Sequence, residues 1–318
     1  MINDKIKNIC IFGIGGIGGV FGGKIADAIF STKDIFHKVY FIARGEHLKK
    51  IKEQGLILNM PGRKGIVCKP QDAQESILNI PTPDLIFLCV KGYDLKNALE
   101  EISKNVKPDT IIIPLLNGVD IYERVREKLK QCIVLPSCVY VGAHIEGYGQ
   151  VSQDSENAQI ITGKDPAYLN LDLEELKVLL EKMNIKCNFK DDSSQDIWEK
   201  YLFIASFALI TAYSEKSFGE VMEDAELKAM TRDIVGEITK IADKKGVKLS
   251  EGIEDNTISK ANNFPFESKT SYQRDVESKK YNNEGELFGG TILRLGLETG
   301  VETPVTKKVY GDILKVNN

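Results

Sequence analysis

The chain has 318 residues, of which 42% are apolar and 28% charged, and its formal net charge is −4. This composition is typical of a soluble globular protein with one large or two ordinary domains, and it excludes a disordered or fibrous chain. The small acidic excess argues against a dedicated nucleic-acid binder, which usually carries a strong basic excess.

The first half of the chain alternates short apolar runs with segments of helical character. It predicts a helix over residues 18–30 and buried strands over residues 9–12, 39–43, 85–90, 110–114 and 133–135. Continuous apolar strands that alternate with helices indicate a parallel sheet covered on both faces. Residues 139–163 are instead polar, alternating and rich in glycine, which predicts antiparallel edge strands.

After residue 190 the strand pattern ends, and helical patterns cover residues 197–213, 220–246 and 291–300. We therefore expect a dinucleotide-binding α/β domain over residues 1–190 and an all-helical substrate and dimerisation domain over residues 191–318. The apolar run 201–213 is too short to span a bilayer. It predicts the buried centre of the helical domain and part of a homodimer contact.

A glycine motif directly follows the first predicted strand and opens the first helix. In Gly13-Ile-Gly15-Gly16-Ile17-Gly18, Gly13 permits a tight turn, Gly15 lets a pyrophosphate approach the backbone, and Gly18 allows close helix–strand packing. The helix N-terminus then faces the phosphate charge. Because the motif sits in a strand–turn–helix context, it favours a dinucleotide cofactor over a purely structural turn.

Three further residues fall at the ends of predicted strands, where open α/β sheets bind ligands. Arg44 ends the second strand, where an arginine suits the 2′-phosphate of NADP(H) and a carboxylate suits NAD(H). Lys91 offers a cation beside phosphate or substrate, and Asn117 a donor and acceptor near the nicotinamide ribose. The alternatives are a solvated surface arginine and two ordinary turn residues.

The cysteines, the N-terminal residues and the histidines indicate the cellular location and whether a metal site is present. The six cysteines are scattered and the N-terminus lacks an apolar signal stretch, so we expect a cytoplasmic protein with no membrane partner. His37, His47 and His144 are far apart and lack metal-ligand spacing, so we expect no metal site.

In the order of its motifs, nearly the whole chain resembles the ketopantoate reductase (2-dehydropantoate 2-reductase) family. Beyond the glycine motif, Arg44, Lys91 and Asn117, the resemblance rests on residues 141–143, 161–163, 198–200, 270–275, 284–290 and 300–304. It implies a Rossmann-type doubly wound sheet followed by a 6-phosphogluconate-dehydrogenase-like helical domain. It also implies NADPH-dependent reduction of ketopantoate to pantoate, a step toward pantothenate and coenzyme A.

The resemblance also assigns roles to individual residues. It implies that Lys200 is the general acid, oriented by Glu284, that Ser271 contacts the substrate carboxylate, and that Asn117 contacts cofactor and substrate. The cofactor contacts would be Gly13, Gly15, Gly16, Ile17, Gly18, Arg44, Lys91, Asn117 and Ala143. These roles fit the chemistry, because hydride delivery to a ketone leaves an alkoxide that needs a proton and a positive field.

The chain departs from the family pattern beside Lys200. Ile204 and Ala208 replace asparagines that the family carries one and two turns along the same helical face. Thr211, on that face, is a possible compensating substrate contact, and Glu286 competes with Glu284 for its role. Two alternatives therefore stay open: a reductase of a different 2-keto acid, and a non-catalytic NADP(H)-binding sensor.

Overall fold

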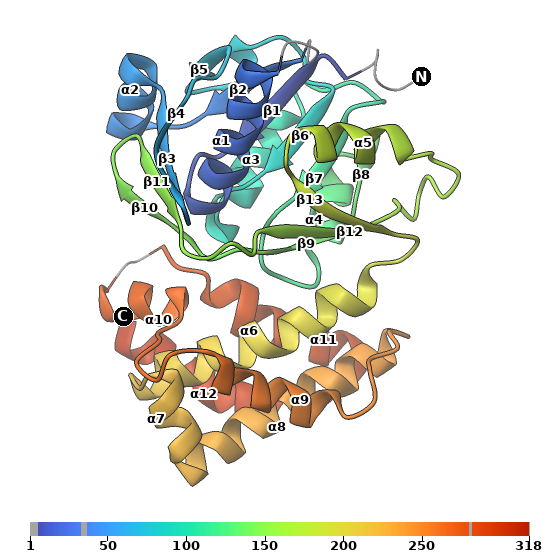
Figure 1. Cartoon of the computed structure of the whole chain (residues 1–318). Helices are drawn as coiled ribbons and strands as arrows, with labels where there is room; N and C mark the ends of the chain where they lie inside the picture. Colours follow the sequence, from blue (N-terminus) through green and yellow to red (C-terminus); the bar gives the residue numbers. More distant parts are fainter. Residues whose placement is uncertain (1–5, 33–36, 280–281, 318) are drawn as a thin grey trace. The chain divides into compact units, whose positions relative to one another are not determined.

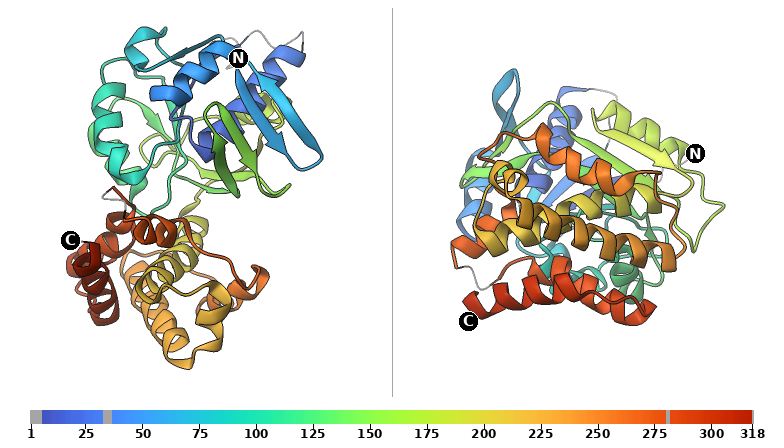
Figure 2. Two further views of the ribbon diagram at one scale, coloured as in Figure 1. Left: turned by 90° about the vertical axis from the view of Figure 1, so that its left-hand side faces the viewer. Right: turned by 90° about the horizontal axis from the view of Figure 1, so that it is seen from below.

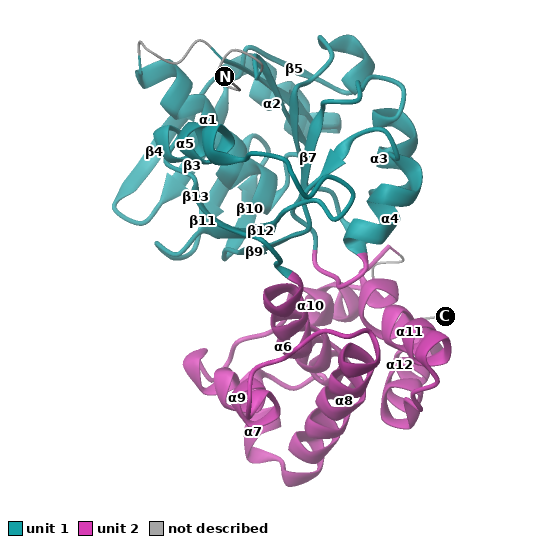
Figure 3. Ribbon diagram, turned by 90° about the vertical axis from the view of Figure 1, so that its right-hand side faces the viewer, with its two compact units in different colours: residues 1–116, 121–193 teal, residues 117–120, 194–318 magenta. Residues whose placement is uncertain are grey.

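The computed structural model describes residues 6–32, 37–279 and 282–317, and the chain forms two compact units (Figure 3). Residues 1–116 and 121–193 form a sheet-containing unit, and residues 117–120 and 194–318 form a helical unit. The segment 117–120 lies within the range predicted for the first domain, yet it packs with the helices. The predicted boundary after residue 190 remains a prediction.

A parallel six-stranded sheet forms the centre of the first unit (Figure 1). Its strands stand in the order β5 (Asp72–Gln74), β2 (Lys38–Ile42), β1 (Asn8–Phe12), β6 (Leu85–Leu88), β7 (Ile111–Pro114) and β8 (Ile133–Val134). The predicted α/β fold class is therefore confirmed. Because the strand order reverses between β1 and β6, a crevice at their carboxyl ends is the expected ligand site.

Helix α1 (Gly16–Ser31) lies between this sheet and a second sheet (Figure 2). The second sheet has the order β10 (Ala143–Gly147), β11 (Gln150–Gln153), β3 (Leu56–Met60) and β4 (Arg63–Cys68). A Cβ atom on Gly22 would lie 3.1 Å from Ile11 of β1, and one on Gly19 would lie 2.5 Å from Val151 of β11. Glycine thus allows both sheets to approach the helix closely.

Residues 139–163 form the predicted antiparallel pairs, but also parallel pairs with β3 and with Lys186–Lys190, and none of these pairs lies at an edge of the six-stranded sheet. Strands β10 and β11 pair within the second sheet. A third sheet has the order β13 (Lys186–Lys190), β12 (Gln159–Gly163) and β9 (Ser137–Tyr140). The β3–β4 hairpin has no counterpart among the predicted strands. The unit is completed by α2 (Gly45–Gln54), α3 (Leu95–Ile102), α4 (Ile121–Lys128) and α5 (Glu174–Lys182).

The helical unit is built around α6 (Ser194–Ser214), whose buried residues include Tyr201, Leu202 and Phe207. Around it lie α7 (Phe218–Glu223), α8 (Ala225–Lys244), α9 (Ile253–Ser259), α10 (Ser271–Glu277), α11 (Thr291–Thr299) and α12 (Pro304–Asn317). Within the described ranges, no helix is both long and apolar enough to cross a membrane.

One predicted helix of this unit is divided in two. The range 220–246 is interrupted at Asp224, which has an extended backbone and caps α8 by accepting hydrogen bonds from the N–H groups of Glu226 and Leu227. The prediction of one helix was wrong because the aspartate caps a new helix instead of continuing the old one.

Candidate active site

The turn after β1, here called the glycine turn (residues 13–18), requires glycine at two positions for different reasons. Gly13 has a φ of 99°, and a Cβ there would lie 2.8 Å from the backbone oxygen of Cys89. A Cβ on Gly18 would lie 1.9 Å from the backbone oxygen of Gly13. Side chains at these positions would prevent the turn and the first turn of α1 from closing.

Gly15 differs from its neighbours because the space beside it is open. It is the N-cap residue of α1, no acidic side chain lies in the first helical turn, and a Cβ would meet no atom within 4 Å. Open space at the N-terminus of a 16-residue helix fits a pyrophosphate, which the helix dipole and N–H groups stabilise. The residues of the glycine turn therefore fit a dinucleotide.

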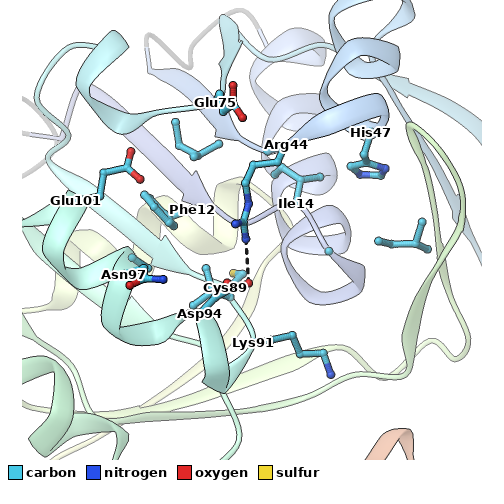
Figure 4. A pocket seen from close by; sticks show the side chains of 17 residues that line it. Phe12, Ile14, Arg44, His47, Glu75, Cys89, Lys91, Asp94, Asn97 and Glu101 are labelled. Atoms are coloured by element: carbon cyan, nitrogen blue, oxygen red, sulfur yellow. Dashed lines mark hydrogen bonds and ion pairs between the residues drawn. The ribbon is translucent and has the colours of Figure 1, made fainter. Parts of the chain in front are cut away.

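A pocket in the same unit brings together Gly13, Gly15, Arg44 and Lys91 (Figure 4). They follow β1, β2 and β6, so the pocket lies at the switch point of the sheet.

The other predicted cofactor residues lie beside this pocket in the sequence or in the fold. Gly16 and Ile17 are the first two residues of α1, and Ala143 is the first residue of β10. A Cβ on Gly16 would lie 2.7 Å from the backbone oxygen of Ala143, so β10 also packs on the glycine turn.

The pocket also contains carboxylates that are not among the predicted site residues. Arg44 pairs with Asp94, with Nη2 and Oδ2 2.9 Å apart, as the dashed line in Figure 4 shows. Glu75 and Glu101 also line the pocket. Asp94 is three residues beyond Lys91, and no sequence pattern indicates that it meets an arginine fifty residues earlier.

His47, considered above only as a metal ligand, has a structural position in this pocket. Its Nδ1 accepts a hydrogen bond of 3.0 Å from the N–H of Gly149, which ties α2 to the β10–β11 turn. Burial lowers the pKa of His47, and a backbone hydrogen bond with Ile14 opposes that shift. Among the described residues, no group of three or more His, Cys, Asp and Glu side chains could hold a metal ion.

In the helical unit, the structure joins two of the predicted residues directly. Lys200 Nζ donates a 2.8 Å hydrogen bond to Asn117 Oδ1. An ion pair between Asp120 and Arg294 of α11 anchors the segment that carries Asn117. Glu199 accepts hydrogen bonds from the N–H and Oγ of Ser250, at 2.9 and 2.6 Å, which fix the first half of α6. Asn117 therefore contacts the Lys200 side chain directly, and the neighbouring contacts fix the segments that carry both residues.

Ser271 begins α10 and is exposed, whereas Thr211 is fully buried. The Oγ1 of Thr211 donates to the backbone oxygen of Phe207 at 2.7 Å and lies 3.0 Å from Oγ1 of Thr270, the N-cap residue of α10. Thr211 thus supports the start of α10, next to Ser271.

The segment with the two competing glutamates packs against the same helices. Glu284 is 4% exposed, whereas Glu286 is exposed and begins a π-helical turn over Glu286–Gly290. Tyr201, which follows Lys200, donates hydrogen bonds of 2.8 and 3.0 Å to the backbone oxygens of Leu287 and Phe288.

The segments that carry Ser271 and Glu284 are also neighbours. The hydroxyl of Tyr272 would lie 2.5 Å from a Cβ on Gly285, so the residue after Ser271 packs on the residue after Glu284. Lys200 and Asn117, together with the segments that carry Ser271 and Glu284, are called the lysine site below. An amine, an amide, a hydroxyl and a carboxylate can bind a polar substrate and exchange a proton with it.

The replaced asparagines leave an apolar stretch along α6. Ala208 is 2% exposed, and Ile204 is half-buried within the apolar side chains of the helical unit. Their side chains can supply only apolar contact, where amides would supply hydrogen bonds.

A parallel sheet with a glycine turn at its switch point, joined to a helical unit with a lysine site, defines a dinucleotide-dependent oxidoreductase fold. The chain belongs to the ketopantoate reductase family: the family model "Ketopantoate reductase PanE/ApbA" matches residues 9–166, and its C-terminal counterpart matches residues 192–316. The protein is accordingly an oxidoreductase that uses a nicotinamide cofactor.

Similar proteins extend over almost the entire chain. "Uncharacterized oxidoreductase YkpB" of Bacillus subtilis is 22% identical over 306 residues, covering 95% of this chain and 96% of the relative. The crystal structure of 2-dehydropantoate 2-reductase from Porphyromonas gingivalis is 25% identical, with a TM-score of 0.82 and coverage of 97% and 99%. D-mandelate dehydrogenase with NADH and anilino(oxo)acetate is 21% identical, with a TM-score of 0.83 and coverage of 98% of both chains.

Proposed function

We propose that the protein reduces ketopantoate to pantoate with NADPH, as part of pantothenate and coenzyme A biosynthesis. The observation that carries the proposal is the hydrogen bond between Lys200 and Asn117, in a unit whose neighbouring segments hold Ser271 and Glu284. A protein that only binds a dinucleotide has no need of this group of side chains. The proposal includes a cytoplasmic location and a homodimer.

When bound, the nicotinamide cofactor would supply the hydride that reduces the ketone carbon of the substrate. Lys200 donates a proton to the ketone oxygen, which becomes the hydroxyl of the product. Its ammonium group also stabilises negative charge on that oxygen before the proton is transferred. Asn117 Oδ1 accepts from Nζ at 2.8 Å and so orients the donor.

The other residues of the lysine site bind and position. Ser271, exposed at the start of α10, donates to the substrate carboxylate, and Thr211 acts through Thr270 to hold that helix end. Glu284 is preferred to Glu286 as the group that orients Lys200, because Glu284 is buried whereas Glu286 is exposed. Arg44 and Lys91, which line the same pocket, would hold the cofactor phosphates.

A second candidate is a reductase of the same mechanism that acts on a 2-keto acid with an apolar side chain. Ile204 and Ala208 favour it, because an apolar wall stabilises hydrocarbon and leaves a substrate hydroxyl without a partner. D-mandelate dehydrogenase, whose fold is similar, forms a ternary structure with NADH and anilino(oxo)acetate.

Steady-state kinetics with NADPH or NADH and a panel of 2-keto acids separates these functions. We expect the highest kcat/KM for ketopantoate with NADPH. Faster turnover of an apolar 2-keto acid than of ketopantoate would support the second candidate. In that case, Ile204→Asn should shift the substrate preference back toward ketopantoate. Cofactor binding without turnover of any acid would contradict both and indicate a sensor.

A further inference from the structure

The nucleotide pocket contains two residue types that usually serve different cofactors. Arg44 follows β2, where an arginine suits a 2′-phosphate. Asp94, from the turn after β6, brings a carboxylate to the same guanidinium group at 2.9 Å (Figure 4). A carboxylate at the adenine ribose is the group that accepts hydrogen bonds from the free hydroxyls of NAD(H).

We propose that Asp94 is a specificity-determining residue that lowers the preference of this pocket for NADP(H) over NAD(H). The inference rests on the proposed function, because it concerns the nucleotide used in that reaction. Its consequence is an enzyme that accepts both cofactors, although it carries the arginine typical of an NADP(H) site.

Competition for Arg44 gives the physical reason. A phosphate monoester carries roughly −1.5 to −2 charges near neutral pH. It must share the guanidinium group with Asp94 or displace the carboxylate, and the two anions repel each other. The side chain of Arg44 is 68% exposed and that of Asp94 29% exposed, so the pair is weak enough for a phosphate to enter. The expected effect is therefore a reduced preference and not an exclusion.

The other charged residues of the pocket also lower its preference for NADP(H). The carboxylates of Glu75, Asp94 and Glu101 outnumber the two permanent cations of the lining, Arg44 and Lys91. Glu101 is held in place because it accepts hydrogen bonds from Ser76 Oγ and the N–H of Ile77, at 2.7 and 2.8 Å. In a pocket with this excess of negative charge, an additional phosphate on the ligand increases the binding affinity less than it would in a cationic pocket.

Asp94→Asn removes the charge with little change in shape. The side chain of Asp94 makes no capping hydrogen bond to α3, so the substitution removes no capping bond. Glu46→Gln is a matched control, because Glu46 is close in sequence to Arg44 but is 58% exposed and pairs with Lys49 at 3.7 Å. It tests for a general effect of net charge.

The test is calorimetric binding of adenosine 2′,5′-bisphosphate and adenosine 5′-monophosphate to the full-length protein. We expect Asp94→Asn to raise affinity for the bisphosphate relative to the monophosphate by about tenfold, the size of one charge-assisted contact. Glu46→Gln should leave the ratio unchanged, and Arg44→Ala should abolish the effect of Asp94→Asn.

The outcomes separate the inference from the proposed function. An unchanged ratio in Asp94→Asn, with both nucleotides bound, would overturn the role of Asp94 and leave the reductase proposal intact. If neither nucleotide binds, and neither NADPH nor NADH binds, the proposed function fails and this inference fails with it.

Discussion

The glycine turn of the sheet-containing unit and the lysine site of the helical unit are built in opposite ways. The glycine turn depends on missing side chains: Cβ atoms at Gly13 and Gly18 would lie 2.8 and 1.9 Å from backbone oxygens. The lysine site depends on side chains that distant segments supply, such as the pair of Lys200 and Asn117. Substitutions should therefore affect folding and cofactor binding in one region and turnover in the other.

The largest expected effect is at Lys200. Lys200→Ala removes the proposed proton donor and should lower kcat by roughly 10²–10⁴-fold. Binding of NADPH, measured by fluorescence titration, should stay unchanged because the glycine turn is intact. Lys244→Ala, an exposed lysine of α8 in the same unit, is the control. Near-normal turnover of Lys200→Ala would remove this residue from the mechanism.

The next effect is on stability, at Gly18. A methyl group 1.9 Å from the backbone oxygen of Gly13 forces the glycine turn and α1 apart. We expect Gly18→Ala to lower the free energy of unfolding by about 3 kcal/mol, at the upper end of overpacking costs. Denaturant unfolding measures this change, and wild-type stability would contradict a close contact between Gly18 and the backbone oxygen of Gly13.

Asp84 lies at the opposite end of the same strands and should affect stability alone. It accepts hydrogen bonds from the N–H groups of Lys7 and Asn8, at 2.7 and 2.8 Å, and pairs with Lys107 at 2.6 Å. Asp84→Asn should cost about 2 kcal/mol near neutral pH, because backbone donors lose a charged acceptor. Cofactor affinity should not change.

The effect of Asp84 should depend on pH in a defined direction. Burial raises the pKa of Asp84, but the bonds from Lys107, Asn8 and Lys7 outweigh it and leave the pKa below its ordinary value. The stabilisation by Asp84 is therefore complete at pH values above 3.8, the ordinary pKa of an aspartate. It is lost as the pH falls through the lower pKa that Asp84 has in the folded protein. Asp109→Asn, which removes an exposed carboxylate 3.8 Å from Lys107, is the control. A constant difference between wild type and Asp84→Asn down to the most acidic pH would contradict this assignment.

The smallest expected effect is at Gly15, where a Cβ meets no protein atom. Gly15→Ala should leave the melting temperature unchanged and weaken NADPH binding by about tenfold, because the methyl group occupies the approach of the pyrophosphate. The contrast with Gly18→Ala is the informative result. If both variants lose stability and keep their affinity, the glycine turn is structural and does not bind the cofactor.

The two regions also differ in how far the sequence predicts them. Gly13, Gly15 and Gly18 lie within one short segment, so their spacing predicts the turn from local geometry alone. Asn117 and Lys200 are 83 positions apart, and only the family resemblance connects them. Neither local spacing nor the family resemblance indicates Asp94, because its contact with Arg44 depends on how β2 and β6 are arranged in the sheet.

Errors in the predicted elements have a similar origin. The continuous apolar strands β1, β2, β6 and β7 were predicted because buried parallel strands carry a strong local pattern. The β3–β4 hairpin is partly exposed and mixes polar with apolar residues, so that pattern is absent. The division between α7 and α8 depends on one capping residue, Asp224, within an otherwise helical run.

The most direct test of the proposed reaction follows the hydride itself. The full-length protein is incubated with a 2-keto acid and NADPH that carries deuterium at both positions of nicotinamide C4, and the product is analysed by mass spectrometry. We predict a 2-hydroxy acid with one deuterium at C2 from wild type, and the same labelled product formed roughly 10²–10⁴-fold more slowly by Lys200→Ala. No 2-hydroxy acid from wild type with any acid of the panel, or a product without deuterium, would contradict hydride transfer.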